Sequence, residues 1–189
     1  PAALGVSSGA PGAPMTTGAA IVIALRILVP LLIFKKNLTG GIIAMLLDGA
    51  DVILIDFLKM GGFSGHYHQI DKVLDTYYLS IEAWIAFGWK NQYERLPALL
   101  LFSFRIVGVV LFELTDRRIV LFLFPNMFEN WWLYIVAVRR WKPSWTPHNW
   151  IGVAVPMGVL LVPKMGQEYL LHFAEAQPWN WFKEHVFDP

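Results

Sequence analysis

Acidic residues gather in the stretch from Leu46 to Glu82, which otherwise has the composition of a membrane protein. An ionised carboxylate at bilayer depth is strongly destabilising unless another group compensates its charge. Acidic side chains in such a stretch are therefore candidates for chemistry. They are Asp48, Asp51, Asp56, Asp71, Asp75 and Glu82.

The spacing of four of these aspartates predicts one cluster. On a helix, Asp48 and Asp51 share a face, and so do Asp71 and Asp75, because residues three or four positions apart lie one above the other. Glu82 continues the stripe of the second pair. Carboxylates that face each other either share protons or hold a hard divalent cation, and Mg²⁺ prefers carboxylate oxygens together with substrate phosphates. The four aspartates are therefore predicted to hold Mg²⁺ or Mn²⁺.

The alternative for the same residues is an internal network of ion pairs. Arg26 and Arg105 both fall inside apolar segments and could neutralise two of the carboxylates, and Lys72 could join them. The two arginines could equally bind a lipid phosphate. The sequence leaves these roles of the arginines open.

The composition places the chain among membrane proteins with several spans. Of its 189 residues, 56% are hydrophobic and only 15% are charged, and the mean hydropathy is +0.49. These values lie outside the range of soluble globular domains. The net charge of +1 implies no nucleic-acid partner. The absence of cysteine excludes disulfides, thiolate metal ligands and a cysteine nucleophile.

The hydrophobic pattern predicts an all-α polytopic membrane protein with about six transmembrane helices in one bundle. We expect the sixth helix to be broken by Pro156 and Pro163. The predicted helices are Ala19 to Phe34, Asn37 to about Lys59, Tyr67 to Trp89, Pro97 to Leu114, Ile119 to Val138, and Trp150 to about Phe173.

The predicted helices define a transmembrane domain of residues 19–174 between two tails. Residues 1–18 form a Gly/Ala/Pro tail that we expect to be flexible, and to become ordered only against a partner surface such as a larger membrane protein assembly. Residues 175–189 form a Trp-rich tail of interfacial character, so membrane lipids are the other expected partner. We expect the bacterial inner membrane as the location.

Basic residues of the predicted connections leave the orientation undecided. If the N-terminus is cytoplasmic, six basic residues lie on the cytoplasmic side and seven on the other. The six are Lys59, Lys72, Arg117, Arg118, Lys164 and Lys183. The seven are Lys35, Lys36, Lys90, Arg95, Arg139, Arg140 and Lys142.

Residues 20–85 resemble the CDP-alcohol phosphatidyltransferases. The likeness consists of an arginine and a proline in the first helix, the sequence LTG, a helix that carries an acid pair, a glycine-containing loop, and D-x-x-x-D in the next helix. The family signature is D-x-x-D-G-x-x-A-R, eight or nine residues, then G-x-x-x-D-x-x-x-D. Here Val52 stands for the first glycine, Leu54 and Ile55 stand for the Ala-Arg pair, and Tyr67 stands for the second glycine. The metal half of the signature is thus retained better than the nucleotide half, which leaves open a divergent substrate or an enzyme that has lost its activity.

The resemblance implies a six-helix membrane bundle in which aspartates hold two divalent metals that bind the diphosphate of a CDP-activated lipid. It implies that Asp48, Asp51 and Asp71 are metal ligands, and that Asp75 is both a ligand and the base that takes the proton from the acceptor alcohol. The alternative function is that of a non-catalytic accessory subunit of a larger membrane complex. A small carrier that uses the buried acids has less support, because the sequence contains no inverted repeat.

Overall fold

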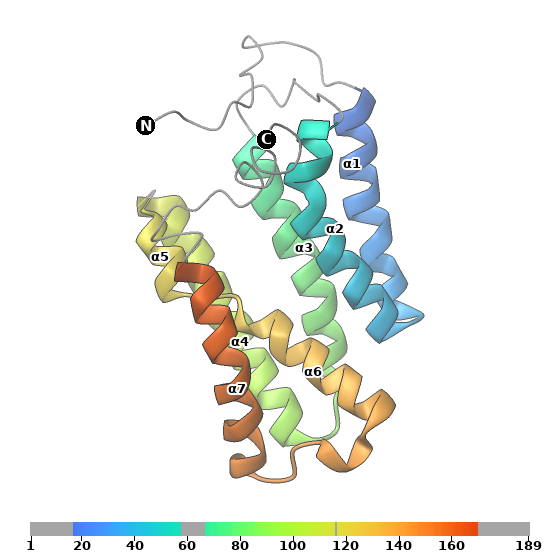
Figure 1. Cartoon of the computed structure of the whole chain (residues 1–189), viewed down its shortest axis with the longest axis vertical. Helices are drawn as coiled ribbons and strands as arrows, with labels where there is room; N and C mark the ends of the chain where they lie inside the picture. The colour runs from blue at the N-terminus through green and yellow to red at the C-terminus, as the bar shows by residue number, and fades with distance from the viewer. Residues whose placement is uncertain (1–16, 58–66, 116, 170–189) are drawn as a thin grey trace, which may run out of the picture. The chain divides into compact units, whose positions relative to one another are not determined.

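The computed structural model describes residues 17–57, 67–115 and 117–169, without the side chains of residues 17, 19, 51–57, 67–69 and 118. Within these ranges every regular element is a helix, which confirms the all-α class (Figure 1). The helices belong to two compact units, one ending at Glu82 and the other beginning at Ala83. Both predicted tails fall largely outside the described residues, as does the glycine-containing loop.

The first unit is a helical hairpin followed by a third helix. The first helix changes from α to 3-10 geometry at Pro30, which lacks the N–H that an α-helix would use there. The chain then reverses, with Lys36 N donating to Leu32 O at 2.8 Å and Gly40 N to Lys36 O at 2.7 Å. The elements are α1 (Thr17–Leu28), η1 (Val29–Phe34), α2 (Asn37–Phe57) and α3 (Tyr67–Phe87).

The hairpin closes tightly because Gly40 has no side chain. A Cβ atom at Gly40 would lie 2.5 Å from the backbone nitrogen of Ile33 and 2.7 Å from its Cα atom. Ile33 itself is completely buried. The glycine of the LTG sequence thus allows the backbone of η1 to lie directly on α2, and so sets the distance between them.

The second unit is organised around one buried helix. It contains the last turn of α3, and then α4, α5, α6, η2 and α7. Helix α6 packs against both α4 and α7, and Phe128, Trp131, Trp132 and Ile135 on α6 are completely buried. The bounds are α4 (Gln92–Thr115), α5 (Arg118–Leu123), α6 (Met127–Trp141), η2 (Pro143–Trp145) and α7 (Trp150–Glu168).

Prolines act differently from the prediction in two places. The segment from Ile119 to Val138, predicted as one helix, is interrupted between α5 and α6. Pro125 disfavours the helical conformation at Phe124, whose φ and ψ are −118° and 63°, and Met127 N donates instead to Pro125 O at 2.8 Å. Conversely, α7 continues through Pro156 and Pro163, so the predicted break there is wrong. Each proline removes only one backbone hydrogen bond, which the rest of the helix can tolerate.

Three helical segments are long and apolar enough to cross a membrane, by length and composition: Gln92–Thr115, Ile119–Trp141, which includes α5 and α6, and Trp150–Glu168. All three belong to the second unit. The first unit contributes two shorter apolar stretches, Ala20–Phe34 and Asn37–Ala50. The described residues therefore support a helical membrane protein with three spans of sufficient length, which is fewer than the six predicted.

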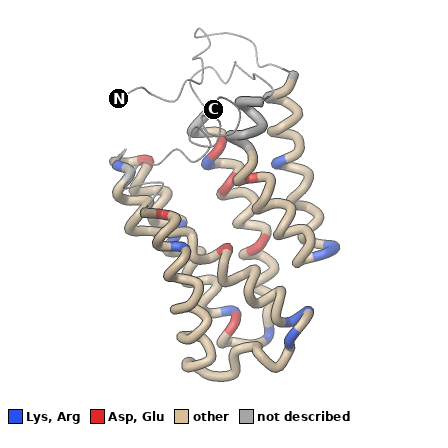
Figure 2. The backbone as a smooth tube through the Cα atoms, in the orientation of Figure 1, with Lys and Arg blue, Asp and Glu red and all other residues tan. Residues whose placement is uncertain are grey.

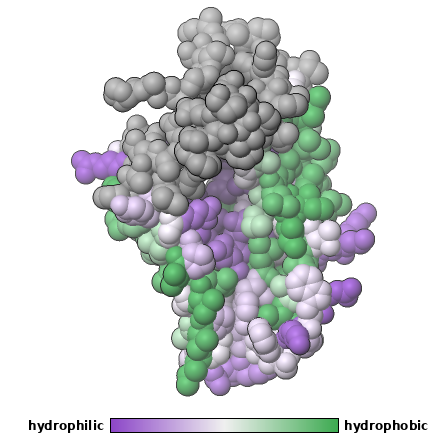
Figure 3. Space-filling view, viewed as in Figure 1, coloured by the Kyte–Doolittle hydropathy of each residue, from purple (hydrophilic) through white to green (hydrophobic). Residues whose placement is uncertain are grey.

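Helix α7 exposes most of its apolar side chains. Ile151, Val155, Val159 and Val162 are between 61% and 75% exposed. They contribute to the hydrophobic strip along α7 in the space-filling view (Figure 3). A surface of this kind is stable in contact with lipid chains and not with water.

A buried ion pair fastens the start of α4 to the end of α6. Glu94 is 2% exposed and forms an ion pair with Arg139, whose guanidinium carbon lies 4.7 Å from the centre of the Trp89 ring. Trp131 Nε1 donates to Glu94 O at 3.1 Å. Together these contacts join Trp89, which precedes α4, to the start of α4 and to helix α6.

Replacing Trp131 with phenylalanine should lower the free energy of unfolding by roughly 1 to 2 kcal/mol, because the hydrogen bond to Glu94 O is lost and a small cavity remains. Thermal unfolding of the detergent-solubilised protein, followed by circular dichroism, measures the change. Trp145→Phe is the control, since that side chain is 66% exposed. Equal shifts for the two variants would show that the Trp131 hydrogen bond contributes nothing.

Candidate functional site: an arginine between two aspartates

Arg26 on α1 joins the other two helices of the first unit. Its side chain is 5% exposed. Nη1 donates to Asp71 Oδ1 on α3 at 2.5 Å, and Nη2 pairs with Asp48 Oδ1 on α2. The planar guanidinium can hold two carboxylates at once because its N–H groups point in fixed, divergent directions. A second link between α1 and α3 runs from Tyr77 OH to Ile27 O, at 3.2 Å.

The face of α3 that bears the acids becomes more buried along the helix. Asp71 and Asp75 are half-buried, whereas Tyr78 is 3% exposed and Glu82 is completely buried. The face predicted from the spacing of Asp71, Asp75 and Glu82 is therefore turned away from solvent. This face of α3 carries acidic residues where it meets α1, because Arg26 of α1 donates a hydrogen bond to Asp71 there.

The structure brings together some of the predicted site residues. Asp48 and Asp71, which are far apart in the sequence, both contact the Arg26 guanidinium. Asp51 lies one turn after Asp48 on α2, and Asp75 one turn after Asp71 on α3. The side chain of Asp51 lies outside the description, so its contacts stay a prediction.

Arg105 has a role that the sequence did not indicate. It lies on α4 in the second unit, where its Nη1 donates to Phe124 O at 3.4 Å. This carbonyl stands at the interruption between α5 and α6, where it has no helical partner. The guanidinium therefore satisfies a backbone group that Pro125 would otherwise leave open.

The donor set of the Arg26 cluster suits a hard cation, although the described side chains alone do not complete a metal site. Within the described side chains, which exclude Asp51, no group of three acidic or histidine residues lies close enough to hold a metal ion. Two carboxylate oxygens nevertheless converge on one cationic group. Carboxylate oxygens are the ligands that Mg²⁺ and Mn²⁺ prefer, so the residues present fit these ions.

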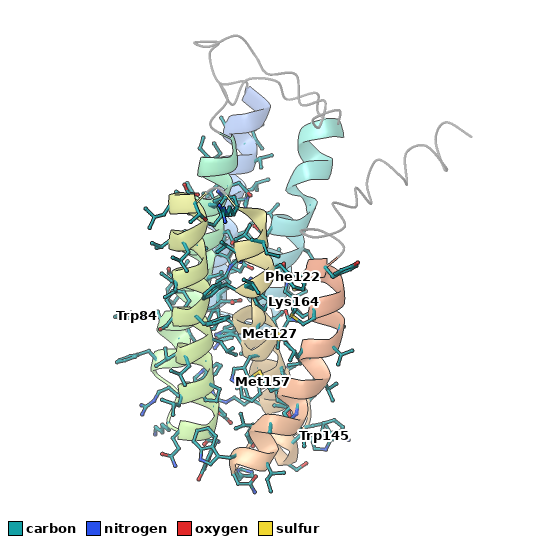
Figure 4. All side chains as sticks on the ribbon, turned by 90° about the vertical axis from the view of Figure 1, so that its left-hand side faces the viewer. Trp84, Phe122, Met127, Trp145, Met157 and Lys164 are labelled. Carbon is teal, nitrogen blue, oxygen red and sulfur yellow. The ribbon has the colours of Figure 1, made fainter. Side chains whose placement is uncertain are left out.

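The second unit buries a further set of polar residues that the sequence did not single out as a group. Lys164 Nζ lies 2.9 Å from Glu168 Oε1, and these residues are 9% and 4% exposed. Lys164 does not lie in a connection, as predicted, but on the inner face of α7, level with Phe122 and Met127 (Figure 4). The spacing of Lys164 and Glu168, four residues apart in an apolar segment, was the available signal.

The start of α6 carries a second pair of buried polar side chains that contact each other. Asn126 Nδ2 donates to Glu129 Oε2 at 3.2 Å, and both residues are less than 10% exposed. The observed hydrogen bond lies within one helix end and shields these polar groups from lipid.

Comparisons of the chain with models of protein families, with curated proteins and with solved structures found no match. The fold and the cluster alone therefore define the class, which is a helical membrane protein with an arginine bridging two aspartates.

Proposed function

We propose that this chain is an integral membrane enzyme that transfers a phosphoalcohol group from a diphosphate-linked donor to an alcohol, with Mg²⁺ or Mn²⁺ as cofactor. The proposal rests on the resemblance to CDP-alcohol phosphatidyltransferases. The observation that carries it is the convergence of Asp48 and Asp71 on one cationic group. We further propose that the helices of the first unit also cross the membrane, giving six spans, and that the membrane is the bacterial inner membrane.

The carboxylates of the proposed site favour a divalent cation. Asp51 lies one turn after Asp48 on α2, and Asp75 one turn after Asp71 on α3, so the proposed site has four carboxylates. Carboxylate oxygens are the ligands that Mg²⁺ and Mn²⁺ prefer, so a divalent ion suits this set of residues.

In this proposal each residue has a separate task. Asp48, Asp51 and Asp71 would hold the metal, which when bound neutralises the donor diphosphate. Arg26 orients two of these carboxylates from the side of α1. Asp75 accepts the proton of the acceptor hydroxyl, whose oxygen then forms a bond to phosphorus while the bond between the two phosphates breaks.

The donor is proposed by chemical class, because the nucleotide half of the family signature is replaced. Val52, Leu54 and Ile55 stand where the family has glycine, alanine and arginine. A diphosphate is the group that the aspartates and their metal would recognise. A CDP-linked alcohol and a lipid-linked diphosphate both carry a diphosphate, and titration with CDP and with a polyprenyl diphosphate distinguishes them.

A second candidate is a non-catalytic subunit of a larger membrane assembly. One observation favours it: Arg26 already pairs with Asp48 and Asp71 and is almost fully buried, as a purely structural ion-pair network requires. In that case the acids would fix the packing of α1 against α2 and α3, and would bind no metal.

Calorimetric titration with Mn²⁺ separates the two candidates. The detergent-solubilised protein is titrated alone, with CDP, and with a polyprenyl diphosphate. We expect Mn²⁺ to bind, one of the two diphosphates to strengthen this binding, and Asp71→Asn to weaken it by on the order of tenfold or more. Glu113→Gln is the matched control, since it removes one exposed carboxylate from the end of α4 in the other unit.

The outcomes are distinct. Strengthening by CDP would identify a nucleotide-linked donor, and strengthening by the polyprenyl diphosphate a lipid-linked one. Binding that is equal in the wild type and Asp71→Asn would remove the aspartates from the metal site. No Mn²⁺ binding under any condition would contradict the enzyme and favour the subunit.

A further inference from the structure

One end of the second unit gathers three segments of the chain. Asn91 Nδ2, just before α4, donates to Pro147 O, between η2 and α7, at 2.7 Å. The rings of Tyr93 on α4 and Trp150 on α7 meet edge to face with centroids 5.3 Å apart. The start of α4, the end of α6 and the start of α7 therefore lie together, and we call this region the α6–α7 end.

The α6–α7 end is strongly basic (Figure 2). It carries five basic residues and one acidic residue, Glu94, which is already paired with Arg139. The other four basic side chains are exposed; they are Lys90, Arg95, Arg140 and Lys142. At the opposite end of α4, the sequence of residues 113–118 contains two acidic and two basic residues and so has no net charge.

Exposed tryptophans surround the same basic end. Trp141 and Trp145 are both 66% exposed, and Trp150 is 57% exposed. In Figure 4, Trp145 lies at the opposite end of the unit from Lys164, and its side chain points away from the helices. Indole rings favour the boundary between lipid chains and headgroups. Ile151, 75% exposed, begins the lipid-facing surface of α7 at this point, so the boundary falls at the start of that helix.

We propose that the α6–α7 end lies in the headgroup layer of the cytoplasmic leaflet, with its exposed cations bound to the phosphates of anionic phospholipids. Basic residues near the ends of spans accumulate on the cytoplasmic side, where anionic lipids attract them. The count of basic residues in the predicted connections did not show this excess of basic residues at one end. That count included Lys164, which is a buried residue of α7.

The absence of cysteine from the chain makes the orientation directly measurable. Ser144→Cys places a single thiol in η2 at the α6–α7 end, and Thr115→Cys places one at the opposite end of α4; both positions are exposed. A membrane-impermeant maleimide should label Ser144→Cys in inverted vesicles only, and Thr115→Cys in intact spheroplasts only. The reverse pattern, or labelling of either variant from both sides, would overturn the cytoplasmic placement.

The lipid partner is tested with the exposed pair at the end of α6. Native mass spectrometry from mixed micelles of phosphatidylglycerol and phosphatidylcholine should show that the wild type retains phosphatidylglycerol preferentially. Arg140→Gln combined with Lys142→Gln should reduce this preference severalfold, whereas Arg117→Gln at the neutral end should not. No preference in the wild type, or equal losses in the two variants, would overturn the lipid site. Neither result bears on Mn²⁺ binding by the aspartates, so the two proposals fail separately.

Discussion

Replacing Arg26 with glutamine should lower the free energy of unfolding by about 3 kcal/mol, because Asp48 and Asp71 would both lose their ion pair with the guanidinium. This figure is at the low end for a broken buried ion pair, since the two aspartates are 31% and 36% exposed. Thermal unfolding in detergent with EDTA present measures the change. Arg95→Gln, an exposed arginine of α4, is the control and should have almost no effect.

The same variant distinguishes a metal site from a structural network. If the aspartates can hold a divalent ion, millimolar Mn²⁺ should restore much of the stability of Arg26→Gln, because the ion replaces the missing charge. Stability that stays low with Mn²⁺ would mean that only a guanidinium fits between the carboxylates. Unchanged stability without Mn²⁺ would contradict the ion pairs themselves.

Replacing Gly40 with alanine should destabilise the hairpin of η1 and α2 by about 3 kcal/mol. The new methyl group would lie 2.5 to 2.7 Å from backbone atoms of Leu32 and Ile33, which cannot move aside as a flexible side chain could. The hairpin would have to open, and Arg26, on the helix that leads into η1, would lose its position between the aspartates. Thermal unfolding and Mn²⁺ titration of the same sample would report both effects.

Gly49 provides a matched control on the same helix. A Cβ atom at Gly49 would meet nothing within 4 Å. Gly49→Ala should therefore be neutral, or stabilise α2 by up to about 1 kcal/mol through its higher helix propensity. If both alanine variants behaved alike, the close approach at Gly40 would not be the feature that sets the hairpin.

Much of the fold could be predicted from hydrophobic patterning. The starts of α2, α3 and α7 coincide with the predicted starts at Asn37, Tyr67 and Trp150. The errors concern proline, whose effect depends on its surroundings. Pro125 interrupts a predicted helix at a place where Arg105 donates a hydrogen bond to the open carbonyl of Phe124. Pro156 and Pro163, in contrast, stay inside α7.

The residues of the candidate site could be predicted, but their pairing could not. Helical spacing placed Asp71 and Asp75 on one face, and an arginine inside an apolar segment indicated an ion pair. Which carboxylates Arg26 would meet depended on how α1 packs, and that follows from the close contact at Gly40. No local pattern encodes a contact between residues that are far apart in the sequence.

The orientation of the α6–α7 end also bears on the proposed donor. In a chain with six spans, successive connections alternate between the two sides of the membrane. If Ser144 is cytoplasmic, the C-terminal end of α2 and the N-terminal end of α3 would then lie on the other side. A soluble nucleotide would not reach a site that opens there, and a lipid-linked diphosphate would be the donor to test first.

The hydrogen bond between Arg105 and Phe124 has a consequence for biogenesis. Phe124 is synthesised after Arg105, so the arginine enters the translocation channel before its partner carbonyl exists. An arginine in the middle of a span opposes insertion by about 2.5 to 3.5 kcal/mol. Helix α4 is thus best released into lipid together with α5 and α6, so that the three helices leave the channel in one event.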